Sequence, residues 1–384
     1  MNDLRSEHVI RMKGRCQMIS RRLPAIGAAM IVLTTVGVAA QSGSAGSRPQ
    51  QPAAKAGAAS TGPAGAKSSW TPARTPDGQP DLQGIWANNS ITPLQRPAQW
   101  AGKQFLTDQE MAALKKAAAA AVADDSDAVF GDSLVLAAIA NEKGKSFEPS
   151  TGNYNNFWLV EREVDNRTSL IVDPADGRIP PLTQEAQDRG AALAAARRRS
   201  PADGPEDRSL GERCLTFGTP RVGAGYNSYY QIVQSPGYVA IVHELGHEVR
   251  VIPVEPRSHV GPRLRQWLGD SRGHWEGDTL VVETTNFSPK STFQGSTANL
   301  HLVERFKRVG EKTLNYQFTV SDPSVWTRPW TVMIPLKGTD EKIYEYACHE
   351  GNTGMEGILS GHRAEEEAAA SAAAKSGSPS IPSR

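Results

Sequence analysis

The stretch Leu300–Val320, with the sequence LHLVERFKRVGEKTLNYQFTV, decides the fold that we expect for this chain. In its second half, apolar side chains stand at every other position, namely at Leu314, Tyr316, Phe318 and Val320. Successive side chains of a strand point to opposite faces of a sheet, so this period of two is typical of an antiparallel strand with one buried face. Gly310-Glu311 marks a turn between the two halves, and the stretch therefore predicts a β-hairpin.

Most of the remaining chain has the composition of further strands. The segments rich in β-branched and aromatic residues are 157–163, 168–173, 229–234, 238–243, 248–254, 279–285, 330–335 and 343–348. Asp165-Asn166 indicates a hairpin turn between the first two segments, and Gly277-Asp278 indicates a turn before 279–285. Gly84-Ile85-Trp86 is similar to the opening of lipocalin-like barrels. Short sequential strands joined by tight turns predict a mainly β fold, either an antiparallel up-and-down barrel of the lipocalin-like kind or a sandwich.

Two peripheral helices are expected beside the strands. Thr107 and Glu110 have the spacing of a capping box, in which each side chain accepts a hydrogen bond from a free amide of the first turn. A second helix is expected from Thr183 through an alanine-rich stretch to Arg199. The arginines that end this stretch favour the C-terminal end of a helix, where positive charge meets the helix dipole.

The first forty residues have the pattern of a secretory signal peptide. Basic residues up to Arg22 precede the apolar run Ala25–Val38, and small residues before Gln41 form a cleavage site. The apolar run is shorter than the roughly 20 residues that a membrane-spanning helix needs, which favours cleavage over an uncleaved anchor. We therefore expect a periplasmic or extracellular protein, translated from Met1 or Met18, with no stable membrane span after removal of the signal.

Composition divides the chain into four parts. Residues 1–40 are the signal peptide, 41–69 are expected to be a disordered linker rich in Ala, Gly, Ser and Pro, 70–363 a single β-rich domain, and 364–384 a disordered tail. The charge is nearly balanced, with 42 Lys+Arg against 41 Asp+Glu, so we expect no nucleic-acid partner. The sequence contains no esterase elbow and no nucleotide-binding glycine motif, so it gives no support to an esterase, nucleotide-binding or dinucleotide-binding function. Ionisable and aromatic residues near predicted strand ends, where pockets of such folds open, indicate a small-molecule ligand as the partner.

His243-Glu244-Leu245-Gly246-His247 matches the HExxH signature of zinc metallopeptidases. That chemistry needs a helix, on which both histidines share one Zn²⁺ and the glutamate activates the bound water. The flanking residues 238–242 and 249–254 are dense in β-branched types, which favour strands. On a strand, positions i and i+4 lie about 13 Å apart, too far to bind one metal ion.

A hairpin that turns at Leu245-Gly246 is the better interpretation of this motif. It places His243 opposite Glu248 and Glu244 opposite His247, at the cross-strand distance of roughly 5 Å. We therefore predict no cofactor. A zinc site at His243 and His247 remains the alternative.

Two cysteines remain after removal of the signal, Cys214 and Cys348. No Cys-x-x-Cys spacing competes for them, and an oxidising compartment favours their pairing as a disulfide over two separate buried thiols. Three other residues are candidates for a site near predicted strand ends. Trp275 lies in a polar and aromatic run before Gly277, and His349 and Glu350 follow the last predicted strand.

Four phrases together resemble a large family of uncharacterised secreted bacterial proteins. They are Pro80–Trp86 (PDLQGIW), Arg167–Pro174 (RTSLIVDP), Gly277–Val282 (GDTLVV) and Tyr346–Asn352 (YACHEGN). The resemblance covers Pro80 to about Arg363 and implies export and a common fold, without an established activity.

The same resemblance bears on the HExxH motif. Glu244, His247 and Arg250 match recurrent positions of that family, whereas His243 does not, which implies that the HExxH match is accidental. The leading hypothesis is therefore a barrel-like domain that binds or converts a small molecule, with a site lined by six residues, namely Glu244, His247, Arg250, Trp275, His349 and Glu350. A secreted zinc metallopeptidase and a non-catalytic structural protein of the cell envelope are the alternatives.

Overall fold

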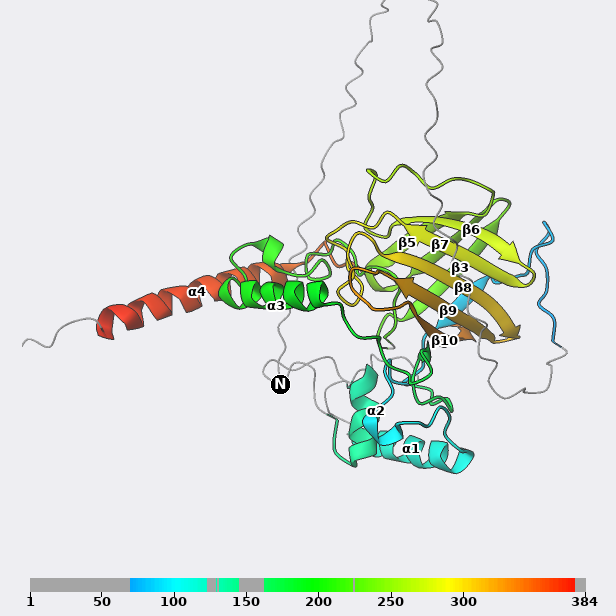
Figure 1. The fold of residues 1–384 in the computed structure, drawn as a ribbon, viewed down its shortest axis with the longest axis horizontal. Helices are drawn as coiled ribbons and strands as arrows, with labels where there is room; N and C mark the ends of the chain where they lie inside the picture. The colour runs from blue at the N-terminus through cyan, green and yellow to red at the C-terminus, as the bar shows by residue number, and fades with distance from the viewer. Residues whose placement is uncertain (1–69, 123–128, 130, 145–161, 224, 377–384) are drawn as a thin grey trace, which may run out of the picture. The chain divides into compact units, whose positions relative to one another are not determined.

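The computed structural model describes residues 70–122, 129, 131–144, 162–223 and 225–376 (Figure 1). The predicted signal peptide, the predicted linker at 41–69 and the last residues of the predicted tail lie outside these residues. Within the part of the chain that is described, no helix combines the length and apolar character needed to cross a membrane.

A single antiparallel sheet forms the body of the protein and wraps into a nearly closed barrel (Figure 1). Its hydrogen-bonded order is β5-β4-β3-β1-β10-β9-β8-β7-β6, and the short strand β2 also pairs with β10. The fold is therefore the predicted antiparallel barrel and not the sandwich. The strands are β1 (Gly84–Ala87), β2 (Ile171–Asp173), β3 (Tyr229–Ser235), β4 (Tyr238–His243), β5 (Glu248–Pro253), β6 (Asp270–Glu276), β7 (Thr279–Thr285), β8 (His301–Gly310), β9 (Thr313–Ser321) and β10 (Trp330–Thr339).

The barrel has a seam between β5 and β6, the two ends of this order. Among the described residues, no ladder of backbone hydrogen bonds joins the two strands. The side chains of Val254 and Ile252 lie against the backbone of Gly273. A Cβ on this glycine would lie 2.9 Å from Val254 Cγ1 and 3.1 Å from Ile252 Cγ2. The glycine is thus what lets the two strands approach here.

The interior of the barrel follows the predicted alternation of β9. Leu314, Tyr316, Phe318 and Val320 are all buried in the main apolar core, as the period of two predicts. The neighbouring strand β8 turns Leu302, Glu304 and Phe306 inward. Glu304, which is fully buried, therefore places a carboxylate on the apolar face of the hairpin that decides the fold.

A buried ion pair joins β5, at the seam, to β8 across the interior of the barrel. Arg250 of β5 donates from Nη1 to Glu304 Oε2 at 2.6 Å and from Nη2 to Glu304 Oε1 at 2.9 Å. The hydroxyl of Tyr316 donates to Glu304 Oε1 at 2.7 Å. Because β5 shares no ladder with β6, this two-pronged contact is the polar link that fastens β5 to β8 across the barrel.

Both predicted helices are present, and two further helices accompany them. Thr107 caps α1 (Asp108–Ala121), and the capping box with Glu110 is formed. Thr183 caps α3 (Gln184–Arg199), which ends at the three arginines. Two helices were not predicted. They are α2 (Gly131–Ala140), which packs beside α1, and α4 (Thr353–Ser376), whose His362 lies 3.4 Å from Asp203 in the segment after α3 (Figure 1). The predicted disordered tail is therefore helical from residue 364 to Ser376.

One strand prediction was wrong. The segment 343–348 contains no strand, because the Tyr344 amide donates to the Glu244 side chain instead of joining a ladder. Most of the first strand of the hairpin predicted around Asp165, 157–163, lies outside the described residues. In the described part, β2 pairs with β10, and Asp165 Oδ1 accepts a hydrogen bond from the Arg167 amide in a local turn.

The disulfide prediction agrees with the structure. Cys214 and Cys348 are bonded, with their Cα atoms 5.6 Å apart across 134 residues of sequence. The bond ties the segment after β10 to the loop that precedes β3. The segment after β10 is thus fixed by a covalent bond and not by strand pairing.

We expect the variant Arg250→Met to lose about 3–5 kcal/mol of unfolding free energy, because it strands a buried carboxylate. The double variant Arg250→Met/Glu304→Gln should lose less than the single one, since its neutral amide still accepts the Tyr316 hydroxyl. Urea denaturation at neutral pH measures both values. A single variant as stable as the wild type would show that the pair does not hold the seam.

Candidate functional site

The HExxH segment is the end of a hairpin and not a helix. His243 ends β4 and pairs with Glu248, the first residue of β5, as predicted. Gly246 has φ +77° and His247 φ +52°, and the His247 amide donates to the Glu244 carbonyl at 3.0 Å, so the chain reverses within these residues. The helix that a zinc metallopeptidase needs is absent, and the zinc interpretation of this motif is wrong. Among the described residues, the one group of metal-ligating side chains close enough to share an ion is Asp203, His362 and Glu366, which contains neither histidine of the motif.

Arg221 fastens the loop that precedes β3 to this end of the hairpin. Arg221 donates from Nη1 to the Leu245 carbonyl at 2.5 Å, from Nε to the Gly218 carbonyl at 3.1 Å, and it pairs with Glu248. Glu248 also accepts hydrogen bonds from the Thr216 hydroxyl and from the Phe217 amide. Burial lowers the pKa of Arg221, and the nearby Glu248 charge opposes that shift. The loop before β3 is thereby fastened to the turn between β4 and β5.

The polar cluster in the barrel begins at the Arg250–Glu304 pair. Burial would lower the pKa of Arg250, but the attraction of Glu304 outweighs it and raises that pKa. Burial, and then the Glu304 charge, raise the pKa of Tyr316 well above its usual value, so this phenol stays protonated as a donor. The positive charge of Arg250 is therefore balanced by the negative charge of Glu304, and the pair has no net charge.

Tyr230 and His243 continue the cluster toward the hairpin end. The Tyr230 ring lies 6.3 Å from the Tyr316 ring and 4.5 Å from the His243 ring, between centroids. Burial raises the pKa of Tyr230 to about 12. Burial, followed by repulsion from Arg221 and Arg250, lowers the pKa of His243 well below 6.5, so the imidazole is neutral.

A cavity of about 360 Å³ opens at this end of the barrel. Its lining includes His243, Tyr230 and Arg221, together with the rings of Phe217 and Phe293. His243 is 4% exposed, and its Nε2 has no hydrogen-bond partner among the described residues. Such an atom costs about 1–3 kcal/mol when left unpaired. The lining of the cavity thus combines aromatic side chains with a histidine whose Nε2 has no hydrogen-bond partner among the described residues.

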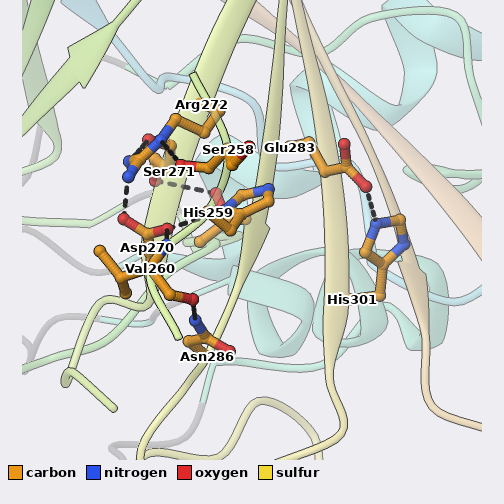
Figure 2. Close-up of polar contacts among 10 residues, drawn as sticks. Ser258, His259, Val260, Asp270, Ser271, Arg272, Glu283, Asn286 and His301 are labelled. Atoms are coloured by element: carbon orange, nitrogen blue, oxygen red, sulfur yellow. Dashed lines mark hydrogen bonds and ion pairs between the residues drawn. The ribbon is translucent and has the colours of Figure 1, made fainter. Parts of the chain in front are cut away.

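A second polar cluster lies beside the seam (Figure 2). The buried carboxylate of Asp270 accepts from His259 Nδ1 at 2.8 Å, from the Val260 amide at 3.0 Å and from Arg272 Nη1 at 2.6 Å. Arg272 Nε also donates to the Ser258 carbonyl at 3.1 Å. These contacts fix the segment 258–260 against the start of β6.

The structure does not gather the six predicted site residues into one site. Glu244 is buried in the hairpin turn, where its Oε1 accepts from the Tyr344 amide at 3.1 Å, whereas His247 in the same turn is exposed. Arg250 points into the barrel. Along the antiparallel order, the turn after Trp275 lies at the end opposite to the turn after Glu244.

His349 and Glu350, the last two of the six, are exposed beyond the disulfide. The residues that sequence reasoning missed are Arg221, Tyr230, Glu304 and Tyr316. One signal pointed to this cluster, namely a glutamate between Leu302 and Phe306 on an otherwise apolar alternating face.

Comparisons with protein families, with curated proteins and with solved structures gave no match.

We expect His243 to make the protein less stable as the pH falls. The folded state keeps this histidine neutral, whereas the unfolded state takes up a proton below about pH 6.5. The free energy of unfolding should therefore fall by up to about 1.4 kcal/mol per pH unit from this residue alone. His243→Phe should lack this part of the slope between pH 7.5 and 5, measured by urea denaturation. The exposed His349→Phe is the control, and an unchanged slope in His243→Phe would contradict the assignment.

Proposed function

We propose that the barrel binds a small, uncharged, partly aromatic molecule in the cavity at its hairpin end. The observation that carries the proposal is His243, a buried neutral histidine that lines the cavity and whose Nε2 has no hydrogen-bond partner among the described residues. A core position that needed only to be filled would be more stable with an apolar side chain. Sites that depart from this rule are expected where function requires it.

The charges around the cavity favour a neutral ligand. Arg221 is already paired with Glu248, and Arg250 with Glu304. A charged ligand would therefore lose its hydration without gaining an unpaired partner of opposite sign. A neutral donor or acceptor group, by contrast, can form a hydrogen bond with the imidazole of His243.

The walls favour a ring. Tyr230, Phe217 and Phe293 line the cavity, and aromatic rings prefer stacked or edge contacts with other rings. The volume of about 360 Å³ is at the lower end of the range for ligand pockets, which suits a small molecule and not a peptide. The cavity supports binding over a purely structural role in the envelope, and its residues give no basis for assigning a catalytic step.

The test uses phenol, indole and benzamide as neutral probes, with benzoate and benzylammonium as charged controls. We expect titration calorimetry to detect the neutral probes on the wild type, with binding about tenfold weaker on His243→Phe, because the variant keeps the ring and loses one hydrogen bond. His349→Phe should bind as the wild type does. Equal affinity of the wild type and His243→Phe, or a preference for the charged probes, would contradict the proposal.

We also propose that the protein is exported to the periplasm or beyond. The signal-like first forty residues support this, and so does the bond between Cys214 and Cys348, because disulfides persist in oxidising compartments. Protein recovered from the periplasm should begin near Gln41 and show no free thiol. Soluble cytoplasmic protein that still begins at Met1 or Met18 would contradict export.

A further inference from the structure

The seam between β5 and β6 contains the second cavity of the barrel, with a volume of about 680 Å³. We call it the seam groove. β5 and the start of β6 form its two sides, and the segment 265–269 lies along it. It is distinct from the hairpin-end cavity, with which it shares no lining residue.

One side of the seam groove is apolar and faces solvent. Val249 and Val251 of β5 are 49% and 62% exposed, and Trp267, which also lines the groove, is 37% exposed. β5 alternates, with Arg250 and Ile252 buried in the barrel, so the two valines belong to its outer face. Large apolar side chains gathered at one cavity mark a surface that binds something apolar.

The other side of the seam groove is cationic. Arg265 uses Nη1 to donate to the carbonyls of Phe287 and Ala298, at 3.1 and 2.7 Å, so its Nε and Nη2 have no partner among the described residues. Arg272 uses Nε and Nη1 for Ser258, Asp270 and Ser271, which leaves its Nη2 as a second donor without a partner there.

The carboxylate in the seam groove does not cancel these donors. Asp270 is the acidic residue of the lining, and its oxygens already accept from His259, Val260 and Arg272 (Figure 2). Arg250, at the floor, is paired with Glu304. Arg265 therefore contributes a positive charge without a counter-ion in the groove, and an anionic group is the complement that it lacks.

We propose that the seam groove binds an amphiphilic anion, a single alkyl chain that ends in a carboxylate. The chain lies against Val249, Val251 and Trp267, and the carboxylate accepts hydrogen bonds from the guanidinium groups of Arg265 and Arg272. A neutral chain would leave those donors unused, and a cationic one would be repelled by them. Apolar walls with a few converging polar groups are the general form of a small-ligand site.

The probe is decanoate, titrated below its micelle concentration and followed by calorimetry, with decanol and decyltrimethylammonium as matched neutral and cationic chains. We expect decanoate to bind at least about tenfold more tightly than either control, since a charge-assisted hydrogen bond separates them. Arg265→Gln should weaken decanoate about tenfold and leave decanol unchanged. Arg189→Gln, on α3 and outside the lining of the groove, is the control and should bind as the wild type does.

A second variant distinguishes loss of the binding site from misfolding of the loop that contains Arg265. Val251→Asp places a negative charge beside the ligand, so it should abolish decanoate binding. Because Val251 is exposed, the urea midpoint of this variant should equal that of the wild type. His243→Phe should bind decanoate normally, because it lies in the other cavity. Failure of the neutral aromatic probes there would thus leave this proposal standing.

Three outcomes would overturn the proposal. The first is equal binding of decanoate, decanol and decyltrimethylammonium, and the second is unchanged decanoate binding by Val251→Asp. The third is binding to vesicles of phosphatidylglycerol and phosphatidylcholine that depends on Arg265 while decanoate does not bind, which would show a membrane-docking surface in place of a site for single molecules.

Discussion

The buried pair between Arg250 and Glu304 is the constraint on which the rest of the structure depends. Backbone hydrogen bonds join every neighbouring pair of strands in the order from β5 to β6, but not the first strand to the last. At that seam the strands approach through side chains, and the pair ties β5 to β8 across the interior behind it. A buried charge pair contributes little net stability compared with apolar packing, but breaking it is costly. The pair therefore matters more for specifying how the barrel closes than for the net stability of the fold.

Closure by side chains has a consequence for binding. A barrel closed by a full ladder would have no gap at which strand edges and outward valines meet a cationic loop. Here β5 and β6 approach closely at Gly273, whereas nearer the hairpin end they leave the seam groove open. The same arrangement places Arg250 at the floor of that groove and Glu304 within reach of Tyr316, so one polar cluster supports the seam and continues toward the end cavity.

Covalent and ionic contacts hold the hairpin end, where regular pairing stops. The disulfide anchors the segment after β10, and Arg221 and Glu248 anchor the loop before β3. Both attachments surround the turn that contains Glu244, and neither uses His243. The histidine is therefore a buried polar group beside the cavity, and its Nε2 has no hydrogen-bond partner among the described residues. This unpaired atom is the reason we propose binding at this end of the barrel.

The sequence by itself determined most of the strands, the capped helices α1 and α3 and the hairpin at Leu245-Gly246. These features follow from local rules, because alternation, capping residues and glycine turns act over a few positions. Only the tertiary structure decided which charges meet. Arg250 and Glu304 are 54 residues apart, and Arg221 and His243 come together through a loop and a hairpin that no local pattern relates. The six residues predicted to share one site lie apart for this reason, since a side chain's partner depends on strand order and register, which composition and spacing do not encode.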